Sequence, residues 1–406
     1  MKQRVLIVNK FYYRRGGDCV CAMNLEQLLR SKGHEVAVFA MRYPENEPSQ
    51  WDSYWPAQVD FAGGASEKLA ALRRVLGHGD IKRCFARILK DFRPDVVHLH
   101  NIHSYLSPVL AKMAAQRRIP VVWTMHDYKL LCPSYSCLRD GKPCELCFTD
   151  KSQVLKLRCM KGSLAASAIA LAEARKWNPK DLQKWTSRFI CPSAFMATKM
   201  ASGGFAPEKL ATICNFIDPQ VATRMERLAP EGSAAPRKPY YCYVGRLSAE
   251  KGVGTLLAAA AELPYDLLVA GDGPLGSELR KRYDSCKNIR FLGRLDASKI
   301  AILLSQARLS VMPSECYENN PLGVIESLCA GTPVVGANIG GIPELLDEAS
   351  GVTYTSGSKE ELKEAIKRLW ERKCDHSALA ARSLRRFTSA AHYNQLSRLY
   401  SEVTAK

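Results

Sequence analysis

The sequence lacks any apolar run of the roughly 18 residues that a membrane span requires. The best candidate, Leu164–Ala172, is interrupted by Ser167 and ends at Glu173, so an ordinary helix is expected there. A secretory signal is also missing, because the apolar residues near the N-terminus extend only from Val5 to Val8. We therefore expect a first buried strand at this end of the chain and a cytoplasmic protein.

Acidic residues are few relative to basic ones, with 40 Asp and Glu against 58 Lys and Arg, a net charge of +18. Such an excess attracts nucleic acid, anionic lipid headgroups or phosphorylated substrates. No recognised nucleic-acid module appears, so nucleic acid is not the expected partner. The basic segments Lys151–Lys161 and Arg175–Lys184, with Trp177 and Trp185, have two interpretations. They are solvated helix faces, or they place the protein on the inner, anionic face of the cytoplasmic membrane.

The 406 residues suffice for two domains with separate cores. Apolar runs of strand length alternate with helical patterns throughout, which indicates parallel α/β units. The expected fold class is α/β, with two Rossmann-like, doubly wound parallel-sheet domains facing a cleft. Strands are expected at Arg4–Asn9, Glu35–Ala40, Asp95–His100, Ile119–Thr124, Arg188–Cys191, Leu210–Cys214, Tyr240–Gly245, Asp266–Ala270, Ile289–Leu292, Leu309–Met312, Pro333–Val335 and Val352–Tyr354.

The Pro-rich, polar stretch Ala229–Pro239 is typical of a linker. It predicts a first domain over residues 1–228 and a second over residues 240–385, followed by a C-terminal helix over residues 386–406. Two placements are open for this terminal helix. It packs back onto the first domain, or it is an outer helix of the second.

One stretch, Pro313–Glu344, contains an unusual pair of carboxylates. Asn319 and Asn320 are N-cap residues and Pro321 suits the first helical position, so a helix is expected from there to Gly331. Its buried face should comprise Leu322, Ile325 and Leu328.

Glu326 lies on this helix among apolar residues, with Leu322 and Ala330 at the i±4 positions. No local cation pairs with it, so we expect a ligand to supply the partner that a buried carboxylate needs. Glu318 precedes the helix, beside N–H groups and a positive dipole end that favour a phosphate. Two carboxylates thus flank a candidate anion site.

Two loops in the second half are candidates for binding phosphate and sugar. Arg246 and Lys251 lie in GRLSAEKG at 245–252, directly after a strand, where ligands bind in open α/β sheets. The alternative is that both are solvated surface cations. Gly271 begins a turn, GDGP at 271–274, whose missing side chains permit close approach of a ligand.

The first half carries polar residues at corresponding places. Gly16 and Gly17 follow the first strand and precede a helix, so their N–H groups suit a phosphate. His126 and Asp127 follow another strand. A third group gathers after a further strand, where its members line an acceptor site or form hydrogen bonds within the loop: His98, His100, Asn101 and His103.

These motifs resemble the family 4 retaining nucleotide-sugar glycosyltransferases of the GT-B fold. The matching residues are GRLSAEKG, GDGP, FLG at 291–293, and Glu318 and Glu326 within YENNPLGVIESLCAGTPVV. In the first half Gly16-Gly17, LLRSKGHEV at 28–36 and HDY at 126–128 also match. The resemblance covers nearly the whole chain, and its motifs occur in the right order at the expected strand ends.

The resemblance implies transfer of a sugar, with retention, from a nucleoside-diphosphate sugar to a saccharide or lipid-linked saccharide, in the biosynthesis of a cell-surface polysaccharide such as lipopolysaccharide or capsule. Arg246 and Lys251 would bind the diphosphate, Glu326 the ribose and Glu318 the transferred sugar. The turn formed by Asn319, Asn320, Pro321 and Leu322 would offer N–H groups to sugar and phosphate. Gly16 and Gly17 would lie near the diphosphate and His126 near the reacting sugar.

The family requires no cofactor or divalent metal for catalysis, in agreement with the two cations. Many members carry Gly-Phe-Gly after the first Glu, where this sequence has Asn319-Asn320-Pro321. That departure bears on the donor sugar. Two other functions remain open: a GT-B nucleotide-sugar epimerase with the same diphosphate site, and a non-catalytic protein that binds membranes or nucleic acid.

The 15 cysteines of a cytoplasmic chain should be mostly reduced. Five of them form what we call the cysteine cluster: Cys132, Cys137, Cys144, Cys147 and Cys159. Cys144 and Cys147 have zinc-ligand spacing, and Cys132 or Cys137 with Cys159 would complete four ligands. Structural zinc, reduced loop thiols and redox chemistry all remain open. We expect the loop 132–159 to shape the acceptor site.

Overall fold

A computed structural model describes residues 2–61, 63–228 and 238–405 of the protein. The chain forms two compact units. The first comprises Met1–Cys137, Cys144–Ile213 and Tyr393–Lys406, and the second comprises Leu138–Pro143 and Cys214–His392. Most of the predicted linker, residues 229–237, lies outside the described residues.

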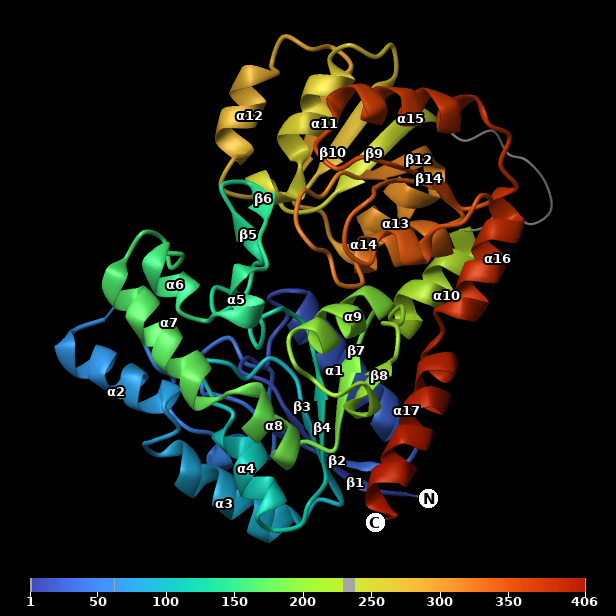
Figure 1. Ribbon diagram of the computed structural model, residues 1–406. Coiled ribbons are helices and arrows are strands. Elements are labelled where there is room, and N and C mark those ends of the chain that lie inside the picture. The colour runs from blue at the N-terminus through green and yellow to red at the C-terminus, as the bar shows by residue number, and fades with distance from the viewer. Residues whose placement is uncertain (1, 62, 229–237, 406) are drawn as a thin grey trace. The chain divides into compact units, whose positions relative to one another are not determined.

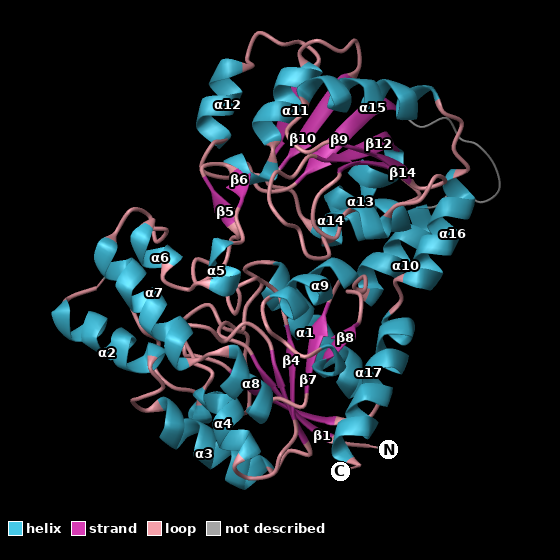
Figure 2. Cartoon of the chain, in the orientation of Figure 1, coloured by secondary structure: helices cyan, strands magenta, loops and turns pink. Residues whose placement is uncertain are grey.

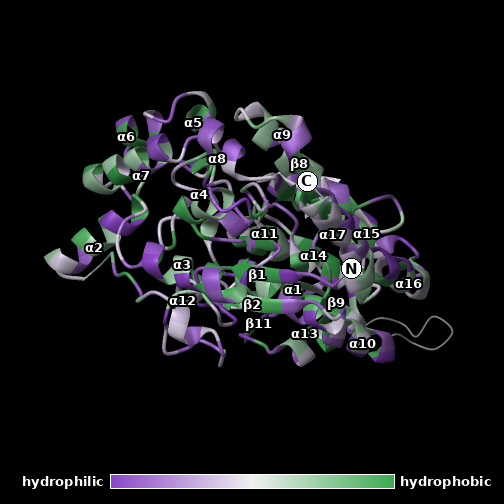
Figure 3. Cartoon of the chain, turned by 90° about the horizontal axis from the view of Figure 1, so that it is seen from below, coloured by the Kyte–Doolittle hydropathy of each residue, from purple (hydrophilic) through white to green (hydrophobic). Residues whose placement is uncertain are grey.

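A six-stranded parallel sheet of order β2-β1-β3-β4-β7-β8 is the centre of the first unit. Its strands are β1 (Arg4–Val8), β2 (Glu35–Phe39), β3 (Val96–Leu99), β4 (Val121–Thr124), β7 (Arg188–Cys191) and β8 (Leu210–Thr212). Val5 of β1 pairs with Val36 on one side and Val96 on the other. The strands are nearly all apolar because parallel sheets are covered on both faces, as β1 and β2 show in Figure 3.

Helices of the first unit lie on both sides of this sheet (Figure 1). The helices of the unit are α1 (Gly17–Ser31), α2 (Ala65–Val75), α3 (Ile81–Phe92), α4 (Val109–Ala115), α5 (Leu146–Thr149), α6 (Gln153–Lys156), α7 (Leu164–Lys176), α8 (Pro179–Trp185), α9 (Ala194–Ser202) and α17 (Ser389–Thr404). Of these, α2, α6 and α7 lie farther from the sheet (Figure 1). The 3-10 turns Asp52–Tyr54 and Pro207–Lys209 complete the unit.

The second unit has a parallel sheet of order β11-β10-β9-β12-β13-β14. Its strands are β9 (Lys238–Val244), β10 (Asp266–Ala270), β11 (Ile289–Gly293), β12 (Ala307–Met312), β13 (Val334–Ala337) and β14 (Gly351–Tyr354). Its helices are α10 (Pro219–Leu228), α11 (Val253–Ala260), α12 (Gly276–Arg282), α13 (Ala297–Gln306), α14 (Leu322–Cys329), α15 (Lys359–Glu371) and α16 (His376–Arg386), with 3-10 turns at Ala249–Lys251 and Pro343–Leu345. A two-stranded antiparallel hairpin, β5 (Leu138–Arg139) and β6 (Lys142–Pro143), groups with this unit. The strand–helix alternation is visible in Figure 2.

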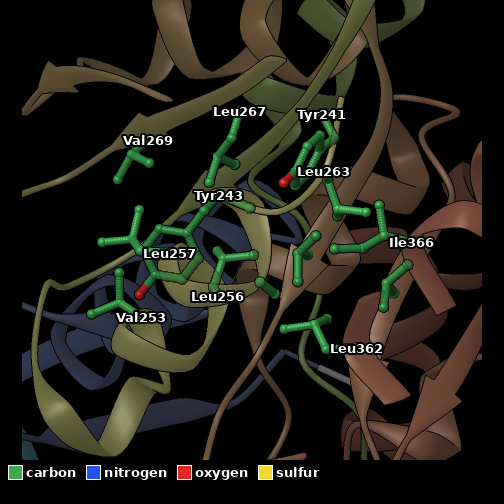
Figure 4. Packing of buried hydrophobic residues seen from close by; sticks show 14 of the residues in the cluster. Tyr241, Tyr243, Val253, Leu256, Leu257, Leu263, Leu267, Val269, Leu362 and Ile366 are labelled. Atoms are coloured by element: carbon green, nitrogen blue, oxygen red, sulfur yellow. The ribbon is translucent and has the colours of Figure 1, made fainter. Parts of the chain in front are cut away.

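The main core of the second unit lies between its sheet and the helices α11 and α15 (Figure 4). Tyr241 and Tyr243 of β9 meet Leu256 of α11 and Ile366 of α15 there, all at most 1% exposed. Burial of such large side chains is the dominant favourable contribution to folding. It fixes β9, whose carboxyl end carries the predicted phosphate loop.

Helix α17 packs on the sheet of the first unit, in agreement with one of the two placements expected for it. Leu396, Leu399 and Tyr400 join the core that contains Val5 and Val96. Helix α16 instead packs within the second unit, where Leu379 and Phe387 lie in the core around α14. The last two helices of the described chain therefore serve different units.

Replacing Leu396 with Ala should destabilise the first unit by about 2–5 kcal/mol, because Leu396 is 0% exposed and its loss leaves a cavity. Tryptophan fluorescence during thermal unfolding measures this, since five of the six tryptophans belong to the first unit. Arg398→Ala, on the exposed side of the same helix, is the matched control and should leave the melting temperature nearly unchanged. Equal melting temperatures for the Leu396→Ala and Arg398→Ala variants would show that α17 does not stabilise this core.

Candidate active site

The second sheet reverses its strand order between β9 and β12. Strands β10 and β11 follow β9 on one side, whereas β12, β13 and β14 extend to the other. In open α/β sheets, ligands bind beyond the carboxyl ends of the strands at such a switch point. The loops in question are 245–252 after β9 and 313–318 after β12, which contain Arg246, Lys251 and Glu318.

Backbone contacts interlock these loops so closely that only glycine fits. Gly252 has φ 65°, and a Cβ atom there would lie 1.8 Å from the carbonyl oxygen of Pro313. Gly340 has φ 62° and would clash with the Glu318 backbone in the same way, at 2.2 Å. The Gly341 N–H donates to the Glu318 carbonyl at 2.7 Å. The backbone positions of Lys251 and Glu318 are thereby fixed relative to each other.

The side chains of Lys251 and Glu318 form an ion pair, with Nζ 2.6 Å from Oε1. Ser314 Oγ donates to the same Oε1 at 2.5 Å. Burial alone would lower the pKa of Lys251, but Glu318 and the neighbouring Cys316 and Glu250 outweigh it and raise that pKa. Lys251 therefore carries a positive charge at neutral pH, next to a carboxylate that is only 13% exposed.

Arg246 is exposed at the same edge of the sheet. Its carbonyl accepts a hydrogen bond from Tyr243 Oη at 2.8 Å. Gly271, with φ 142°, lets the GDGP turn contact the first loop, since a Cβ atom there would lie 1.8 Å from the Gly245 carbonyl oxygen. The Leu247 N–H donates to the Asp272 carbonyl at 3.0 Å. The turn and the arginine loop therefore form one rigid surface.

Glu326 projects from α14 and is partly buried. Burial, and then repulsion from Asp218, raises the pKa of Glu326 to about 7. Among the described residues no cation or hydrogen-bond donor pairs with this carboxyl group. Hydroxyl donors from a ligand would offset the cost of its ionised form.

The predicted start of this helix is wrong by one residue. Helix α14 begins at Leu322, and Pro321 is the N-cap with extended ψ of 119° and no side-chain cap. Asn320 is buried, and its Oδ1 accepts from the Asn215 N–H at 3.0 Å instead of capping the helix. Proline forces its predecessor out of helical geometry, so Asn320 is free to make this tertiary contact. Asn319 is partly exposed.

The first sheet has its switch point between β1 and β3, and the loops there also interlock. The Asn101 N–H donates to Asn9 Oδ1 at 3.1 Å, and the Lys10 N–H donates to the Asn101 carbonyl at 3.0 Å. Asn101 Nδ2 also donates to Asp18 at 2.8 Å. Gly16 and Gly17 are exposed at the start of α1, with Gly16 as an extended N-cap.

The three histidines predicted for the acceptor side, His98, His100 and His103, are all buried, at 1%, 3% and 8% exposed. Their role in an acceptor site stays a prediction. His103 stacks on Trp123, and burial lowers the pKa of His103 to about 3. His98 lies within β3, and His103 lies in the loop that follows it.

His100 and His126 lie together, with His100 Nδ1 2.9 Å from His126 Nε2. Burial lowers the pKa of His126, partly offset by Asp18 and Asp127. Burial raises the pKa of Asp127, whose Oδ1 accepts from the Lys129 N–H at 2.9 Å. His126 is therefore a neutral imidazole at pH 7, suited to hydrogen bonding.

A histidine network continues inward from this pair. His100 stacks on His98 with ring centroids 4.5 Å apart. His98 Nδ1 lies 2.5 Å from Tyr400 Oη of α17, and His98 Nε2 lies 2.7 Å from Thr124 Oγ1. Asp18, Ser314 and Tyr400 thus support the candidate site although they were not predicted. Asp18 follows the glycine pair and Ser314 opens the carboxylate stretch, whereas no local pattern marks Tyr400.

Three members of the cysteine cluster meet inside the first unit. The thiols of Cys137 and Cys147 hydrogen-bond to Cys132 and lower the pKa of Cys132, while the pKa of each of the two donors is raised. All 15 cysteines are unbridged. No group of three His, Cys, Asp or Glu side chains in the described ranges is arranged as a metal site. Zinc binding by Cys132, Cys137, Cys144, Cys147 and Cys159 stays a prediction.

Trp177 does not present its ring for membrane contact, because it is 6% exposed and donates from Nε1 to the Val75 carbonyl at 2.8 Å. Trp185 is partly exposed. Within the described ranges, no helix combines the length and the apolar character of a transmembrane span.

Comparison with known proteins agrees with this architecture. The family model "Glycosyltransferase Family 4" matches residues 15–221, and "Glycosyl transferases group 1" matches residues 225–386. Glycogen synthase of Mycobacterium tuberculosis is 30% identical over 357 residues, covering 81% of this chain and 76% of that protein. Sulfoquinovosyl transferase SQD2 of Arabidopsis thaliana is 25% identical over 283 residues, 66% of this chain; the match spans about half of that relative, 48%.

Among solved structures, Anabaena Alr3699/HepE in complex with UDP has a TM-score of 0.65 at 18% identity, covering 99% of this chain and all of that one. Two parallel-sheet domains with strand-end loops of this kind define the GT-B fold. The chain belongs to glycosyltransferase family 4, and it is a glycosyltransferase.

Replacing Glu326 with Gln should stabilise the protein at pH 8 and leave it unchanged at pH 4. The raised pKa means that ionisation is penalised in the folded state, and the penalty grows as pH rises from about 4.5 to about 7. A neutral amide removes it, a gain of the order of 1–3 kcal/mol above pH 7. Melting temperatures at both pH values measure the difference, with the exposed Glu348→Gln as control. A gain that is the same at both pH values would contradict a buried, high-pKa carboxyl.

The zinc hypothesis predicts one zinc ion per chain in the purified protein and a lower melting temperature after treatment with EDTA. Cys132→Ser should then release the metal, whereas Cys286→Ser, outside the cluster, should retain it. Protein without stoichiometric zinc, whose melting EDTA leaves unchanged, would rule the hypothesis out.

Proposed function

We propose that the protein transfers a hexosyl group, with retention, from a nucleoside-diphosphate sugar to a saccharide or lipid-linked saccharide in the assembly of a cell-surface polysaccharide. The observation that carries the proposal is the interlocked pair of loops at the β9/β12 switch point. They bring an exposed arginine, a protonated lysine and a carboxylate to one edge of the sheet.

In this proposal Arg246 and Lys251 bind the donor diphosphate, and the Gly271 turn lets the nucleotide approach the backbone. Glu318, which is paired with Lys251, accepts hydrogen bonds from the sugar hydroxyls. Glu326 accepts from the ribose hydroxyls, which stabilise its carboxylate and lower its pKa from about 7. Donor binding therefore releases a proton near neutral pH.

The chemistry then needs no enzymic nucleophile. The bond from the anomeric carbon to the phosphate oxygen breaks while the acceptor hydroxyl attacks the same face, and the departing phosphate oxygen takes the hydroxyl proton. Arg246 and Lys251 stabilise the charge that develops on the diphosphate. His126, a neutral imidazole, hydrogen-bonds to the reacting sugar on the acceptor side.

Two comparisons support the substrates. UDP is bound in the Anabaena structure, which favours a nucleoside-diphosphate donor. The mycobacterial relative is named as a synthase of glycogen, a polysaccharide. The net charge of +18 suits an anionic donor.

Arg246→Ala and Lys251→Ala should each raise the KM for the donor by about tenfold or more, because each removes a charge-assisted contact to phosphate. Initial rates with a nucleotide sugar identified by thermal-shift screening measure this. Lys281→Ala, which removes an exposed charge on α12, is the control and should keep the normal KM. Normal donor KM in both site variants would remove these residues from the phosphate site.

The same assay distinguishes transfer from epimerisation. A transferase releases nucleoside diphosphate slowly until the acceptor is added, whereas an epimerase converts the donor without an acceptor. Donor conversion in the absence of acceptor would overturn the proposal.

A further inference from the structure

A pocket of about 360 Å³ opens in the first unit, at the edge of its sheet opposite the loops that carry Asn101 and His126. Its wall includes Pro120, Ser187 and Lys209, which directly precede β4, β7 and β8. Because all strands of this sheet are parallel, their N-terminal ends share one edge. The loops with Asn101 and His126 lie at the other edge, so the pocket is separate from that site.

Four cationic side chains line the pocket: Arg118, Lys184, Arg188 and Lys209. Two of them are held in place by consecutive carbonyls of the wall. Lys209 Nζ donates to the Thr186 carbonyl at 3.0 Å, and Arg188 Nη1 donates to the Ser187 carbonyl at 3.1 Å. Each of these two positive groups is therefore held at the wall of the pocket.

Negative charge is scarce around these cations. Glu402 is the single carboxylate among the lining residues. Within the described ranges no carboxylate forms an ion pair with Arg118 or Arg188, and Asp181 pairs with Lys184 at 3.0 Å. Arg118 and Arg188 carry like charges, and a bound anion would offset their mutual repulsion.

The positive surface continues past Trp185 into a second pocket of about 560 Å³. Four more cations line it: Lys82, Lys112, Arg117 and Lys176. Lys112 Nζ lies 5.5 Å from the centre of the Trp185 ring. Burial, followed by repulsion from Lys176, Lys82 and Arg73, lowers the pKa of His78 in the same wall.

We propose that the first pocket binds a phosphate group, presented by a lipid headgroup or by a soluble phosphate compound. The guanidinium groups of Arg118 and Arg188 match phosphate oxygens in pairs, and Lys209 adds a point charge. Trp185 gives an apolar wall to the group that bears the phosphate. The proposal does not depend on the donor site.

The test compares wild type with Arg118→Ser/Arg188→Gln, which removes two charges from the pocket. Lys68→Ser/Lys90→Gln removes two exposed charges elsewhere on the same unit and is the matched control. Inorganic pyrophosphate is titrated by calorimetry, and vesicles of phosphatidylcholine with and without phosphatidylglycerol are tested by co-sedimentation. Thermal melting of each variant confirms that it is folded.

We expect the pocket variant to bind one of the two probes about tenfold or more weakly, while the control binds normally. Loss of pyrophosphate binding alone identifies a soluble phosphate ligand, and loss of vesicle binding alone identifies a headgroup. Binding of pyrophosphate at the proposed donor site should be the same in the wild type, the pocket variant and the control, because neither variant changes Arg246 or Lys251. If the pocket variant and the control bind both probes alike, the proposal is overturned.

Discussion

The loops 245–252 and 313–318 contact each other through backbone atoms, at positions where only glycine fits. The proposed donor site depends on this contact. A side chain at Gly252 or Gly340 would push apart the backbones that carry Lys251 and Glu318. These two side chains are partly buried, and each would be costly to hold there without the other. Backbone packing, ion pairing and the proposed phosphate recognition are therefore parts of one arrangement.

The first unit uses polar side chains where the second uses glycine. At its switch point Asn9 and Asn101 tie the loops after β1 and β3 together. The histidine network extends from His126 through His100 and His98 to Tyr400. The hydrogen-bonding groups of the candidate site are thus supported from within the core, which favours a rigid arrangement of His100 and His126.

Much of this architecture follows from local sequence. The apolar runs at β1, β9 and β12 are buried on both sides, so hydrophobic pattern alone located them. The donor loops were located because glycines and cations follow those runs directly. Glu326 was identified because its i±4 neighbours are apolar, and its raised pKa agrees with that reasoning.

Contacts distant in sequence account for the errors. Asn320 has the composition of a helix cap, but Asn215, far away in the sequence, binds its side chain. His98 and His103 were predicted as site residues after a strand, yet contacts with Tyr400 and Trp123 bury their side chains. Tyr400 reaches His98 only because α17 returns to the first unit. Neither periodicity nor spacing encodes such tertiary contacts.

The return of α17 has a consequence for synthesis. A ribosome completes the strands of the first sheet before the sheet of the second unit exists, but Leu396 and Tyr400, which cover the first sheet, emerge only after both sheets. The apolar surface around Val5 and Val96 therefore stays uncovered until the second unit has been translated. During that interval the first domain is incomplete and exposes an apolar surface, a state that chaperones recognise.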